Sequence, residues 1–583
     1  MTEAQWRRRF RAARVTLPSW ARDDPERLVY ASNAGGKWEL YAWDRRADSH
    51  RPVTDRPEGT LVGALDPSGE WIWWFNDDRG NEFGRWMTEP FGGGAARPAA
   101  PDLEPAYSTG LALGRGFSIQ GSSTNEGSIV HLLRAGEAPI PLYAHREESE
   151  VAGLSRDEDL WCLSHSEHGD SRHPALRVLS LDGQGVAELW DGPGLGLYAS
   201  GWSRVPGDHR LLVLHERRDL PRPMLWWPDI GDTLDLELDL PGEVGASWYP
   251  DGTAILLSHD HRGRVELLRL ELETGRLDDL GIERGTISAA RIRPDGEIWY
   301  SWSNAATPPE VRAGSSVLLR PAGEQAPPGR TVSDHEVGGV HVFVTEPEGE
   351  RPHPTIFDIH GGPPSHNTDS FSPVLQAWVD HGFAVVQVNY RGSSGYGRTW
   401  RDALEGNPGL TELEDIGNAH DYVVAAGIAD PGGVILSGGS WGGYLTLLGL
   451  GTQPDRWSLG MAAVPVADYF AAYEDEMEPL KAFDRDLFGG TPEEIPEEYR
   501  KRSPMTYVDK VRVPILILAG ENDPRCPIRQ IDNYIAELVE LSKPHEVYRY
   551  EAGHGSLLVE ERIRQEEAML AFASRYLGTP PPL

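Results

Sequence analysis

Short apolar runs alternate with turn residues over the first part of the chain, from residue 20 to about residue 320. Trp, Tyr, Val, Ile and Leu gather in strand-length runs, and Gly, Pro, Asp and Asn separate these runs. No long helical period survives in this part. Such a pattern is typical of strands joined by tight turns. It predicts an all-β domain over residues 20–320.

The pattern repeats with a regular spacing. Strand and turn units recur as "LDPSGEWIWWF", "RVPGDHRLLVL", "WYPDGTAILLS" and "RIRPDGEIWYS", and Pro206, Pro250 and Pro294 are 44 residues apart. In the Pro-Asp-Gly turns, proline fixes φ at the first turn position and glycine accepts a positive φ. A repeat of this length is that of one four-stranded propeller blade. Counting weaker copies upstream, we predict a seven-bladed β-propeller.

The pattern of apolar and polar residues changes after "RPAGEQAPPGR", at residues 320–330. Buried strand runs such as "PTIFDIH", "FAVVQVNY" and "PILILAG" now alternate with amphipathic helical segments such as "LEDIGNAHDYVVAAG". This alternation predicts a doubly wound, mostly parallel sheet. We therefore expect a linker at 321–330 and an α/β domain at 331–583. At the other end, residues 1–19 are expected to form a short helix that packs on this α/β domain, with a frayed tail as the alternative.

Composition and charge narrow the possible partners. The chain has 583 residues, too many for one hydrophobic core, and a formal net charge of -35. Such a surface repels phosphate backbones and anionic lipid headgroups, so neither nucleic acid nor a membrane is expected as a partner. No apolar run of membrane-spanning length and no signal-peptide core occurs, which predicts a cytoplasmic protein. Whether the chain forms a homo-oligomer stays open.

Cysteine and histidine usage gives no sign of a metal site. Cys162 and Cys526 are the only cysteines and are far apart in sequence, which excludes a disulfide framework and a four-cysteine zinc site. His259 and His261 could in principle bind metal, but no third ligand accompanies them at a recognisable spacing. We expect neither a metal nor another cofactor.

One glycine-rich segment, "LSGGSWGGYL" at 436–445, contains a candidate nucleophile. Its Gly438–Gly442 core fits the pattern G-x-S-x-G and lies between a strand-like run and a helix-compatible run. Glycines at these positions allow a sharp turn that presents the hydroxyl of Ser440 above a sheet. The pentapeptide alone also arises by chance, so a simple glycine-rich turn is the alternative reading.

A serine hydroxyl is a weak nucleophile and needs a base, which in turn needs an acid to hold its tautomer. In the hydrolase fold these residues follow in the order Ser, Asp or Glu, and His, each after a strand. "VPILILAGENDPRCP" offers Asp523 after one strand, and "HEVYRYEAGHGS" offers His554 after the next. Glu521, closer to its strand end, is the alternative acid. The expected triad is Ser440, Asp523 and His554.

The reaction also needs donors for the oxyanion, each typically worth about 3 to 4 kcal/mol. "DIHGGPPS" places an HGG-type loop at 360–363, at the end of a predicted strand and 80 residues before Ser440. The expected donors are the backbone N–H groups of Gly362 and Trp441. The alternative is a simple Gly-Gly-Pro turn.

Together, the motifs and the propeller resemble the prolyl oligopeptidase family (S9) of serine peptidases. The HGGP form is more similar to the acylaminoacyl-peptidase branch than to prolyl endopeptidases or dipeptidyl peptidase IV, in which a tyrosine contributes to the oxyanion site. The resemblance covers nearly the whole chain and is carried by five motifs: "HGGP" (360–363), "NYRGSSGYGR" (389–398), "GGSWGGY" (438–444), "GENDPRCP" (520–527) and "AGHG" (552–555).

The resemblance implies further substrate-binding residues. Arg525 would bind a substrate carbonyl, with a surface arginine paired to an acid as the alternative. The S1 pocket, which holds the side chain before the scissile bond (P1), would include Val466 and Tyr469, although both fit a core role as well. Such walls would favour a hydrophobic P1 side chain.

The resulting functional hypothesis is a serine peptidase that cleaves short peptides through an acyl-enzyme, an acylaminoacyl peptidase or a related oligopeptidase. The propeller would cover the site and admit only short, unfolded peptides. One alternative is a dipeptidyl peptidase, for which Glu147 and Glu148 would bind the free amine. Another is an esterase with the same triad. An inactive scaffold would need a missing triad member, and none is missing.

Overall fold

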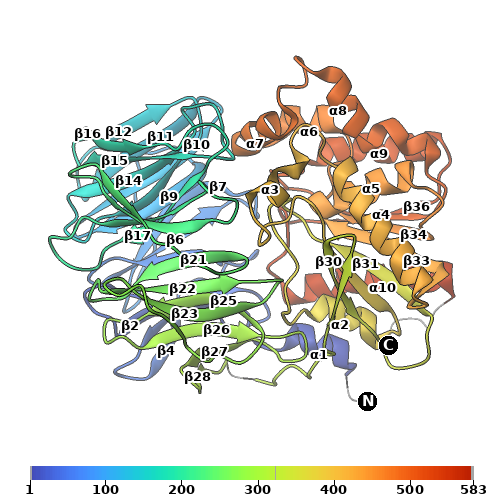
Figure 1. The fold of residues 1–583 in the computed structure, drawn as a ribbon, viewed down its shortest axis with the longest axis horizontal. Helices are drawn as coiled ribbons and strands as arrows, with labels where there is room; N and C mark the ends of the chain where they lie inside the picture. The colour runs from blue at the N-terminus through green and yellow to red at the C-terminus, as the bar shows by residue number, and fades with distance from the viewer. Residues whose placement is uncertain (1–2, 322, 579–583) are drawn as a thin grey trace.

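The computed structural model describes residues 3–321 and 323–578. Two domains lie side by side, a β-rich domain at the left of Figure 1 and an α/β domain at the right. Residues 1–2, 322 and 579–583 belong to the expected N-terminal segment, the linker and the end of the second domain. These residues lie outside the part of the chain that is described.

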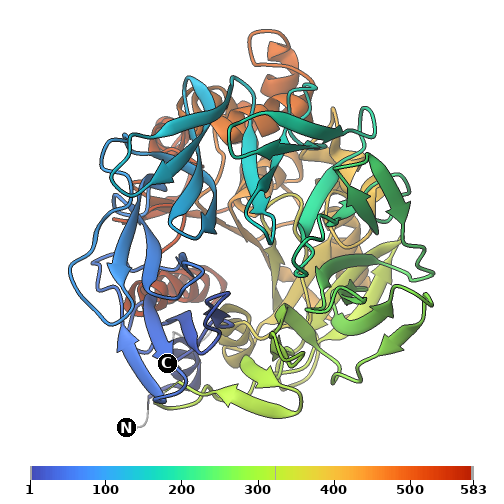
Figure 2. The same ribbon diagram turned by 90° about the vertical axis from the view of Figure 1, so that its left-hand side faces the viewer.

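Strands β1–β28 build the first domain. Five groups of four consecutive strands form separate antiparallel sheets, namely β1–β4, β13–β16, β17–β20, β21–β24 and β25–β28. In Figure 2 the sheets of this domain are arranged as a ring. The bounds are β1 Ser19–Trp20, β2 Arg27–Ser32, β3 Glu39–Asp44, β4 Ser49–Pro52, β5 Gly63–Leu65, β6 Trp71–Asp77, β7 Phe83–Pro90, β8 Arg97–Pro98, β9 Ala106–Gly114, β10 Phe117–Thr124, β11 Gly127–Arg134, β12 Ile140–His145, β13 Ser149–Leu154, β14 Leu160–His165, β15 Ala175–Ser180, β16 Gly185–Leu189, β17 Leu197–Trp202, β18 Leu211–His215, β19 Arg222–Trp227, β20 Asp232–Asp235, β21 Glu243–Trp248, β22 Ala254–Asp260, β23 Val265–Glu271, β24 Leu277–Asp279, β25 Thr286–Ile292, β26 Ile298–Ser303, β27 Glu310–Ala313 and β28 Ser316–Leu319.

The remaining eight strands, β5–β12, form one continuous sheet. Strand β8 has two residues and pairs only with Met87 and Thr88 of β7. The start of β7 is therefore left open, and β9 pairs there through Phe83 and Gly84. The expected seven-bladed propeller is thus wrong in its number of blades: five separate four-stranded sheets form, and β5–β12 join in one eight-stranded sheet.

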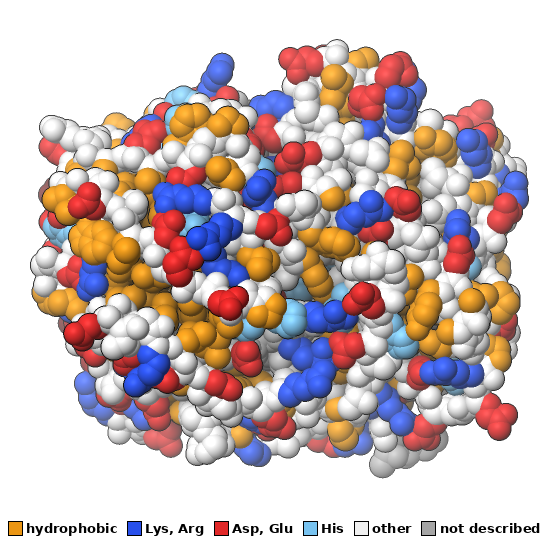
Figure 3. Space-filling model, viewed as in Figure 1, with side chains coloured by type: hydrophobic (Ala, Val, Ile, Leu, Met, Phe, Trp, Pro, Cys, Tyr) orange, Lys and Arg blue, Asp and Glu red, His pale blue; other side chains and the backbone are white. Residues whose placement is uncertain are grey.

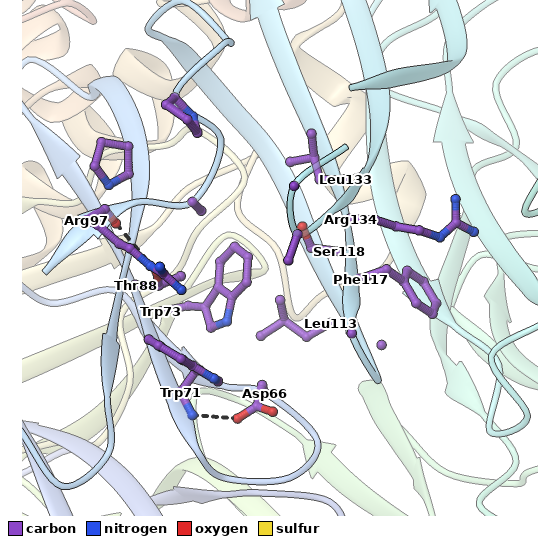
Figure 4. A pocket seen from close by; sticks show the side chains of 17 residues that line it. Asp66, Trp71, Trp73, Thr88, Arg97, Leu113, Phe117, Ser118, Leu133 and Arg134 are labelled. Carbon is purple, nitrogen blue, oxygen red and sulfur yellow. Dashed lines mark hydrogen bonds between the residues drawn. The ribbon is translucent and has the colours of Figure 1, made fainter. Parts of the chain in front are cut away.

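A cavity of about 380 Å³ lies in this merged sheet. Its walls include Trp71, Trp73, Leu113 and Phe117, which Figure 4 shows around the hollow. All of its lining residues belong to the propeller, and none is an expected triad member. We therefore separate this cavity from the candidate active site.

The second domain is built on an eight-stranded sheet in the order β29-β30-β32-β31-β33-β34-β35-β36. Strands β29 and β30 are antiparallel to their neighbours, and β31–β36 run parallel. The mostly parallel sheet that the sequence predicts is therefore present. The strand bounds are β29 Ser333–Val337, β30 Val340–Thr345, β31 His353–Ile359, β32 Ala384–Asn389, β33 Ala429–Gly439, β34 Leu459–Ala463, β35 Ile515–Gly520 and β36 His545–Tyr550.

Helices cover both faces of this sheet, because neighbouring strand residues point to opposite faces. In β33, for example, Ile435 joins the core cluster that contains α2 and α10, whereas Leu436 joins the cluster that contains α4 and α5. The helices are α2 Pro373–Asp380, α3 Arg398–Arg401, α4 Leu410–Ala425, α5 Trp441–Thr452, α6 Tyr469–Asp475, α7 Glu478–Phe488, α8 Pro496–Arg502, α9 Ile528–Glu540 and α10 Val559–Leu577, with short 3-10 turns at Asp402–Leu404 and Pro504–Lys510.

Helix α1, Gln5–Arg11, lies beside α2 and α10 of the second domain (Figure 1). Trp6 and Phe10 lie one turn apart on this helix and are buried in the cluster of α2 and α10. Arg9 forms an ion pair with Asp380 at the end of α2. The start of the chain is thus part of the second domain's core.

Charged side chains of both signs are intermixed on the face shown in Figure 3. Many acids are paired with arginines, as in the bidentate contact between Arg264 and Asp334. Among the described residues, no helix has both the length and the apolar character needed to cross a membrane.

A charged network joins the propeller to α3 and to the 3-10 turn that follows it. Arg401 of α3 contacts the buried Glu216 of the propeller, and His173 contacts both Asp170 (2.7 Å) and Asp402 (3.1 Å). Burial alone would lower the pKa of His173, but the hydrogen bonds to the two aspartates outweigh it and raise this pKa to about 9. The raised pKa of His173 thus depends on contacts with both domains, Asp170 in the propeller and Asp402 in the α/β domain.

Candidate active site

Ser440 lies at a sharp turn between β33 and α5. Its φ of 55° and ψ of -121° are unusual for a residue with a side chain. The turn is fixed on both sides, since the Ser440 N–H donates to the Ala463 carbonyl (2.9 Å) and the Ser440 carbonyl accepts from the Tyr444 N–H (2.9 Å). A conformation of this kind costs about 1 to 3 kcal/mol and persists only where the surroundings enforce it.

The glycines around Ser440 allow a close approach of three elements. A Cβ atom on Gly442 would lie 2.0 Å from the Ile359 carbonyl oxygen at the end of β31, and one on Gly438 would lie 2.5 Å from the carbonyl carbon of Gly442. Both contacts are with backbone atoms that cannot move aside. The two outer glycines of the G-x-S-x-G pattern are therefore required by packing.

Asp523 and His554 form a hydrogen-bonded pair. The Nδ1 atom of His554 lies 2.8 Å from Oδ2 of Asp523, and Oδ1 of Asp523 accepts from the backbone N–H groups of Arg525 (2.8 Å) and Cys526 (3.0 Å). The Asp523 side chain is 0% exposed and that of His554 is 19% exposed. The acid is thus fixed, and the imidazole keeps Nε2 available. Glu521, the alternative acid, accepts instead from Arg549.

The strand topology brings Ser440 to this pair. Ser440 follows β33, Asp523 follows β35 and His554 follows β36, and these parallel strands end at the same edge of the sheet. The hydrophobic strands therefore carry the three expected triad residues to one edge, although they are up to 114 residues apart in sequence.

The expected oxyanion loop lies against the same turn. Strand β31 pairs with β33 so that Ile359 faces Gly438, and the loop leaves directly after Ile359. A Cβ on Gly361 would lie 3.2 Å from Cβ of Ser440 and 3.7 Å from the Trp441 nitrogen. Trp441 is the first residue of α5, so its N–H has no acceptor within the helix. Gly362 follows with a φ of 121°, which favours glycine.

His360 supports this loop from inside the domain. Its Nε2 atom lies 2.9 Å from Oγ of Ser393, and its ring stacks on Tyr390 with centroids 4.2 Å apart. Burial lowers the pKa of His360 to about 4, so the ring is neutral at pH 7. The sequence marks His360 only as part of the HGGP motif, and its support of the loop is visible only in the structure.

The three predicted substrate-binding residues have different surroundings. The Arg525 guanidinium is bound by both carboxylate oxygens of Glu82, at 2.8 and 2.9 Å, in the propeller turn between β6 and β7. Val466 and Tyr469 are 8% and 1% exposed. The Tyr469 ring packs edge-on against Tyr444, with centroids 5.3 Å apart. Arg525 thus lies at the domain boundary, and the other two are buried behind the turn of Ser440.

The propeller also contacts the loop that carries His554. A Cβ on Gly553 would lie 1.8 Å from the Gly80 carbonyl oxygen, so the two backbones touch. On the other side of His554, the Trp38 N–H donates to the Leu557 carbonyl (3.1 Å). Sequence analysis missed these contacts, because nothing in the polar turn "DDRGNE" distinguishes it from other hairpin turns.

A cavity of about 580 Å³ lies at this boundary. Arg525 and Leu557 line it from the α/β domain, and Glu82, Trp86 and Tyr107 are among its propeller residues. Its volume falls in the range of sites for small ligands. The expected substrate-binding arginine and residues of the propeller therefore line the same cavity.

The atoms of Asp523, Cys526 and His554 that could bind a metal lie within 4.8 Å of one another. However, the oxygens of Asp523 already accept three hydrogen bonds, and burial raises the pKa of the Cys526 thiol well above its usual value. A protonated thiol is a poor ligand. These groups fit an acid–base pair better than a metal site.

The comparisons with known proteins agree with this geometry. Residues 369–580 match the model of the prolyl oligopeptidase family. The relatives include dipeptidyl peptidase family member 6 of Caenorhabditis elegans, which is 31% identical over 250 residues, 40% of this chain and 34% of the relative. The acylamino-acid-releasing enzyme of Arabidopsis thaliana is 27% identical over 354 residues, 52% of this chain and 45% of the relative.

These matches thus span less than half of the relatives' own length. The fold similarity extends further. A crystal structure of puromycin hydrolase superposes with a TM-score of 0.84 at 20% identity, covering 100% of this chain and 97% of that one. The two-domain fold of a propeller and an α/β hydrolase is therefore shared over the whole chain.

Proposed function

We propose that this protein is a serine peptidase that hydrolyses short peptides through an acyl-enzyme. The observation that carries the proposal is the Asp523–His554 hydrogen bond of 2.8 Å at the sheet edge where the strained turn presents Ser440. The match of residues 369–580 to the prolyl oligopeptidase family supports the same reaction.

In the proposed reaction, Nε2 of His554 takes the proton of the Ser440 hydroxyl as Oγ attacks the peptide carbonyl carbon. Asp523 holds the imidazole and stabilises its positive charge. The N–H groups of Gly362 and Trp441 bind the oxyanion of the tetrahedral intermediate. His554 then gives its proton to the leaving amine. Water, activated by the same imidazole, hydrolyses the ester and regenerates Ser440.

The cavity of about 580 Å³ at the domain boundary, lined by Arg525 and by propeller residues, supports a short peptide as the substrate, because a propeller over the site would exclude folded chains. Within peptidases, the leading candidate is an acylaminoacyl peptidase or a related oligopeptidase, as the HGGP loop suggests. The name of the Arabidopsis relative agrees with this candidate. Val466 and Tyr469 would give S1 apolar walls, which by themselves favour a hydrophobic P1 residue.

A dipeptidyl peptidase is the second candidate, and one observation favours it. Glu147 forms an ion pair of 3.0 Å with Arg485 of α7, which places the Glu147–Glu148 pair against the α/β domain. Burial raises the pKa of Glu148, which also accepts from Ser123. A carboxylate so placed could bind a free substrate amine. An esterase would use the same triad.

A panel of chromogenic substrates tests the proposal. It contains the p-nitroanilides of acetyl-Leu, acetyl-Ala, Gly-Pro and Z-Gly-Pro and a p-nitrophenyl ester, assayed with wild type, Ser440→Ala and Glu148→Gln. We expect cleavage of acetylated amino-acid anilides that is lost in Ser440→Ala and unchanged in Glu148→Gln. Cleavage of Gly-Pro-p-nitroanilide alone, lost in Glu148→Gln, would establish the dipeptidyl peptidase. Turnover of the ester alone would reject the peptidase.

A further inference from the structure

Two carboxylates are buried on the helices α6 and α7 of the α/β domain. Glu476 caps α6 and Asp484 lies on α7, and each residue is only 5% exposed. Within the described part of the chain, Oε1 of Glu476 is buried without a hydrogen-bond partner. Buried polar groups in native proteins are almost always bonded, so an unbonded carboxylate oxygen needs an explanation.

Two phenols share this environment. The hydroxyls of Tyr444 and Tyr469 are also buried without a hydrogen-bond partner among the described residues. Burial raises the pKa of both phenols, and nearby acids raise it further: Glu412 and then Asp484 for Tyr444, and Asp484 for Tyr469. The Tyr469 ring packs between the rings of Tyr444 and Phe488, with centroids 5.3 and 4.9 Å apart, and Asp484 lies one turn before Phe488 on α7. We call Glu476, Asp484, Tyr444 and Tyr469 the acid cluster. It offers two carboxylates and two hydroxyls within an otherwise apolar core.

Backbone contacts tie the acid cluster to the reactive residues. Tyr444 lies one helical turn after Ser440, whose carbonyl accepts from the Tyr444 N–H at 2.9 Å. On the other side, the N–H of Met477, next to Glu476, donates to the carbonyl of Pro524, next to Asp523, at 3.0 Å. The acid cluster therefore lies between the helix that begins after the nucleophile and the loop that carries the acid.

The thiol of Cys526 gives a second measure of this proximity. After burial and the charge of Asp523, the charges of Glu476 and Asp484 raise the pKa of this thiol. Cys526 lies three residues after Asp523 and packs in the same core cluster as Val466 and Tyr469. Glu476 also directly follows the helix that begins at Tyr469, one of the expected walls of S1.

Within residues 3–321 and 323–578, the two basic side chains nearest in sequence to these acids are bound elsewhere. Lys481, whose charge acts on Glu476, is bound by Glu478 at 2.9 Å, and Arg485 is bound by Glu147 at 3.0 Å. Burial raises the pKa of Asp484 to about 8, and burial with the charge of Asp484 raises the pKa of Glu476 well above its usual value. A buried carboxylate gains most from a cation that can donate several hydrogen bonds to it.

We propose that the acid cluster forms the inner end of S1 and binds the cationic side chain of a P1 arginine or lysine. Val466 and the ring of Tyr469 would pack along the aliphatic stem, while Glu476 and Asp484 would bind the charged head. The apolar walls and the acids then have one common ligand. The inference rests on the proposed function and specifies its substrate class as peptides cleaved after basic residues.

Three acetylated anilides test this directly: acetyl-Arg, acetyl-Leu and acetyl-citrulline p-nitroanilide. Citrulline has nearly the shape of arginine but no charge. We expect kcat/KM for the arginine substrate to exceed that for citrulline by about 30-fold, as a buried charged hydrogen bond allows. Asp484→Asn and Glu476→Gln should each reduce this ratio to within about threefold of one. Glu474→Gln, an exposed acid on α6, is the matched control and should keep the ratio.

The rate on acetyl-Leu-p-nitroanilide is the second readout, and in the control variant Glu474→Gln it should stay within about threefold of wild type. An arginine-to-citrulline ratio near one in the wild type, or a ratio unchanged in both Asp484→Asn and Glu476→Gln, would overturn the inference and leave the peptidase standing. Failure to cleave any of the three substrates, together with no reaction of Ser440 with a fluorophosphonate, would instead overturn the proposed function.

Discussion

Arg525 of the α/β domain is bound by Glu82 of the propeller through two hydrogen bonds of 2.8 and 2.9 Å. Arg525 follows Asp523 by two residues, and its N–H donates to the Asp523 carboxylate. One turn of the propeller therefore reaches the backbone that positions the proposed acid. Interdomain contact and the geometry of the site are linked at this point.

The first prediction separates the two roles open to Arg525. If its guanidinium binds a substrate carbonyl, Arg525→Met should reduce kcat/KM by about 10- to 100-fold, mainly through KM, because a charged hydrogen bond contributes about 1.5 to 3 kcal/mol. Glu82→Gln keeps the arginine and should stay within about threefold of wild type. Steady-state kinetics on one anilide measure both. If kcat/KM fell as much in Glu82→Gln as in Arg525→Met, Arg525 would act through its ion pair with Glu82 and not by binding substrate.

The second prediction concerns the glycines that flank His554. A Cβ on Gly553 would meet the Gly80 carbonyl at 1.8 Å, whereas a Cβ on Gly555 would meet nothing within 4 Å. Gly553→Ala must push the propeller turn and the His554 loop apart, so we expect kcat to fall at least about tenfold. Gly555→Ala should retain kcat within about twofold. Equal activity of the two variants would contradict the role of this contact.

The third prediction concerns stability at the turn of Ser440. Gly442→Ala places a methyl group 2.0 Å from the Ile359 carbonyl, while Gly439→Ala finds its nearest atoms, in Ala463, at 3.9 Å. Overpacking against backbone should lower the free energy of unfolding by about 3 kcal/mol or more. The free energy of unfolding of the control, Gly439→Ala, should stay within about 1 kcal/mol of wild type. Urea unfolding measures both, and similar midpoints would refute the packing argument.

The fourth prediction is a pH dependence at the domain interface. The pKa of His173 is about 9 in the folded state and is near 6.5 in an unfolded chain. Since the folded pKa is the higher one, protonated His173 stabilises the folded state. This contribution to the free energy of unfolding is fully present below about pH 6.5 and is lost as pH rises through about 9. The effect is on the order of 3 kcal/mol at most. We expect the melting temperature of wild type to fall more steeply than that of His173→Asn between pH 7 and 9.5. Parallel curves would contradict this.

The sequence predicts the parts of the site that depend on local pattern. Ser440 is recognisable because its glycines are required by contacts within a few residues and with one neighbouring strand. Asp523 and His554 are recognisable because each follows a buried apolar strand, and parallel strands end at one edge of a sheet. The Asp523–His554 hydrogen bond then follows from topology.

Other features depend on contacts that no local pattern encodes. Glu82 meets Arg525 across 443 positions, and the turn that carries Glu82 has the composition of any polar hairpin. The merging of two blades depends on β8 being only two residues long. Glu476 and Asp484 lie in the highly charged run "YEDEMEPLKAFDRD", and their burial arises only when α6 and α7 fold over the core.

The central claim is that Ser440, activated by His554 and Asp523, forms the covalent intermediate. A fluorophosphonate reagent that phosphonylates activated serines, followed by peptide mass spectrometry, tests it most directly. We expect one adduct per chain, on the peptide that contains Ser440, and no adduct in Ser440→Ala. The control is Ser365→Ala, which replaces an exposed serine near the oxyanion loop and should be labelled fully. No adduct on wild type, or undiminished labelling of Ser440→Ala, would contradict it.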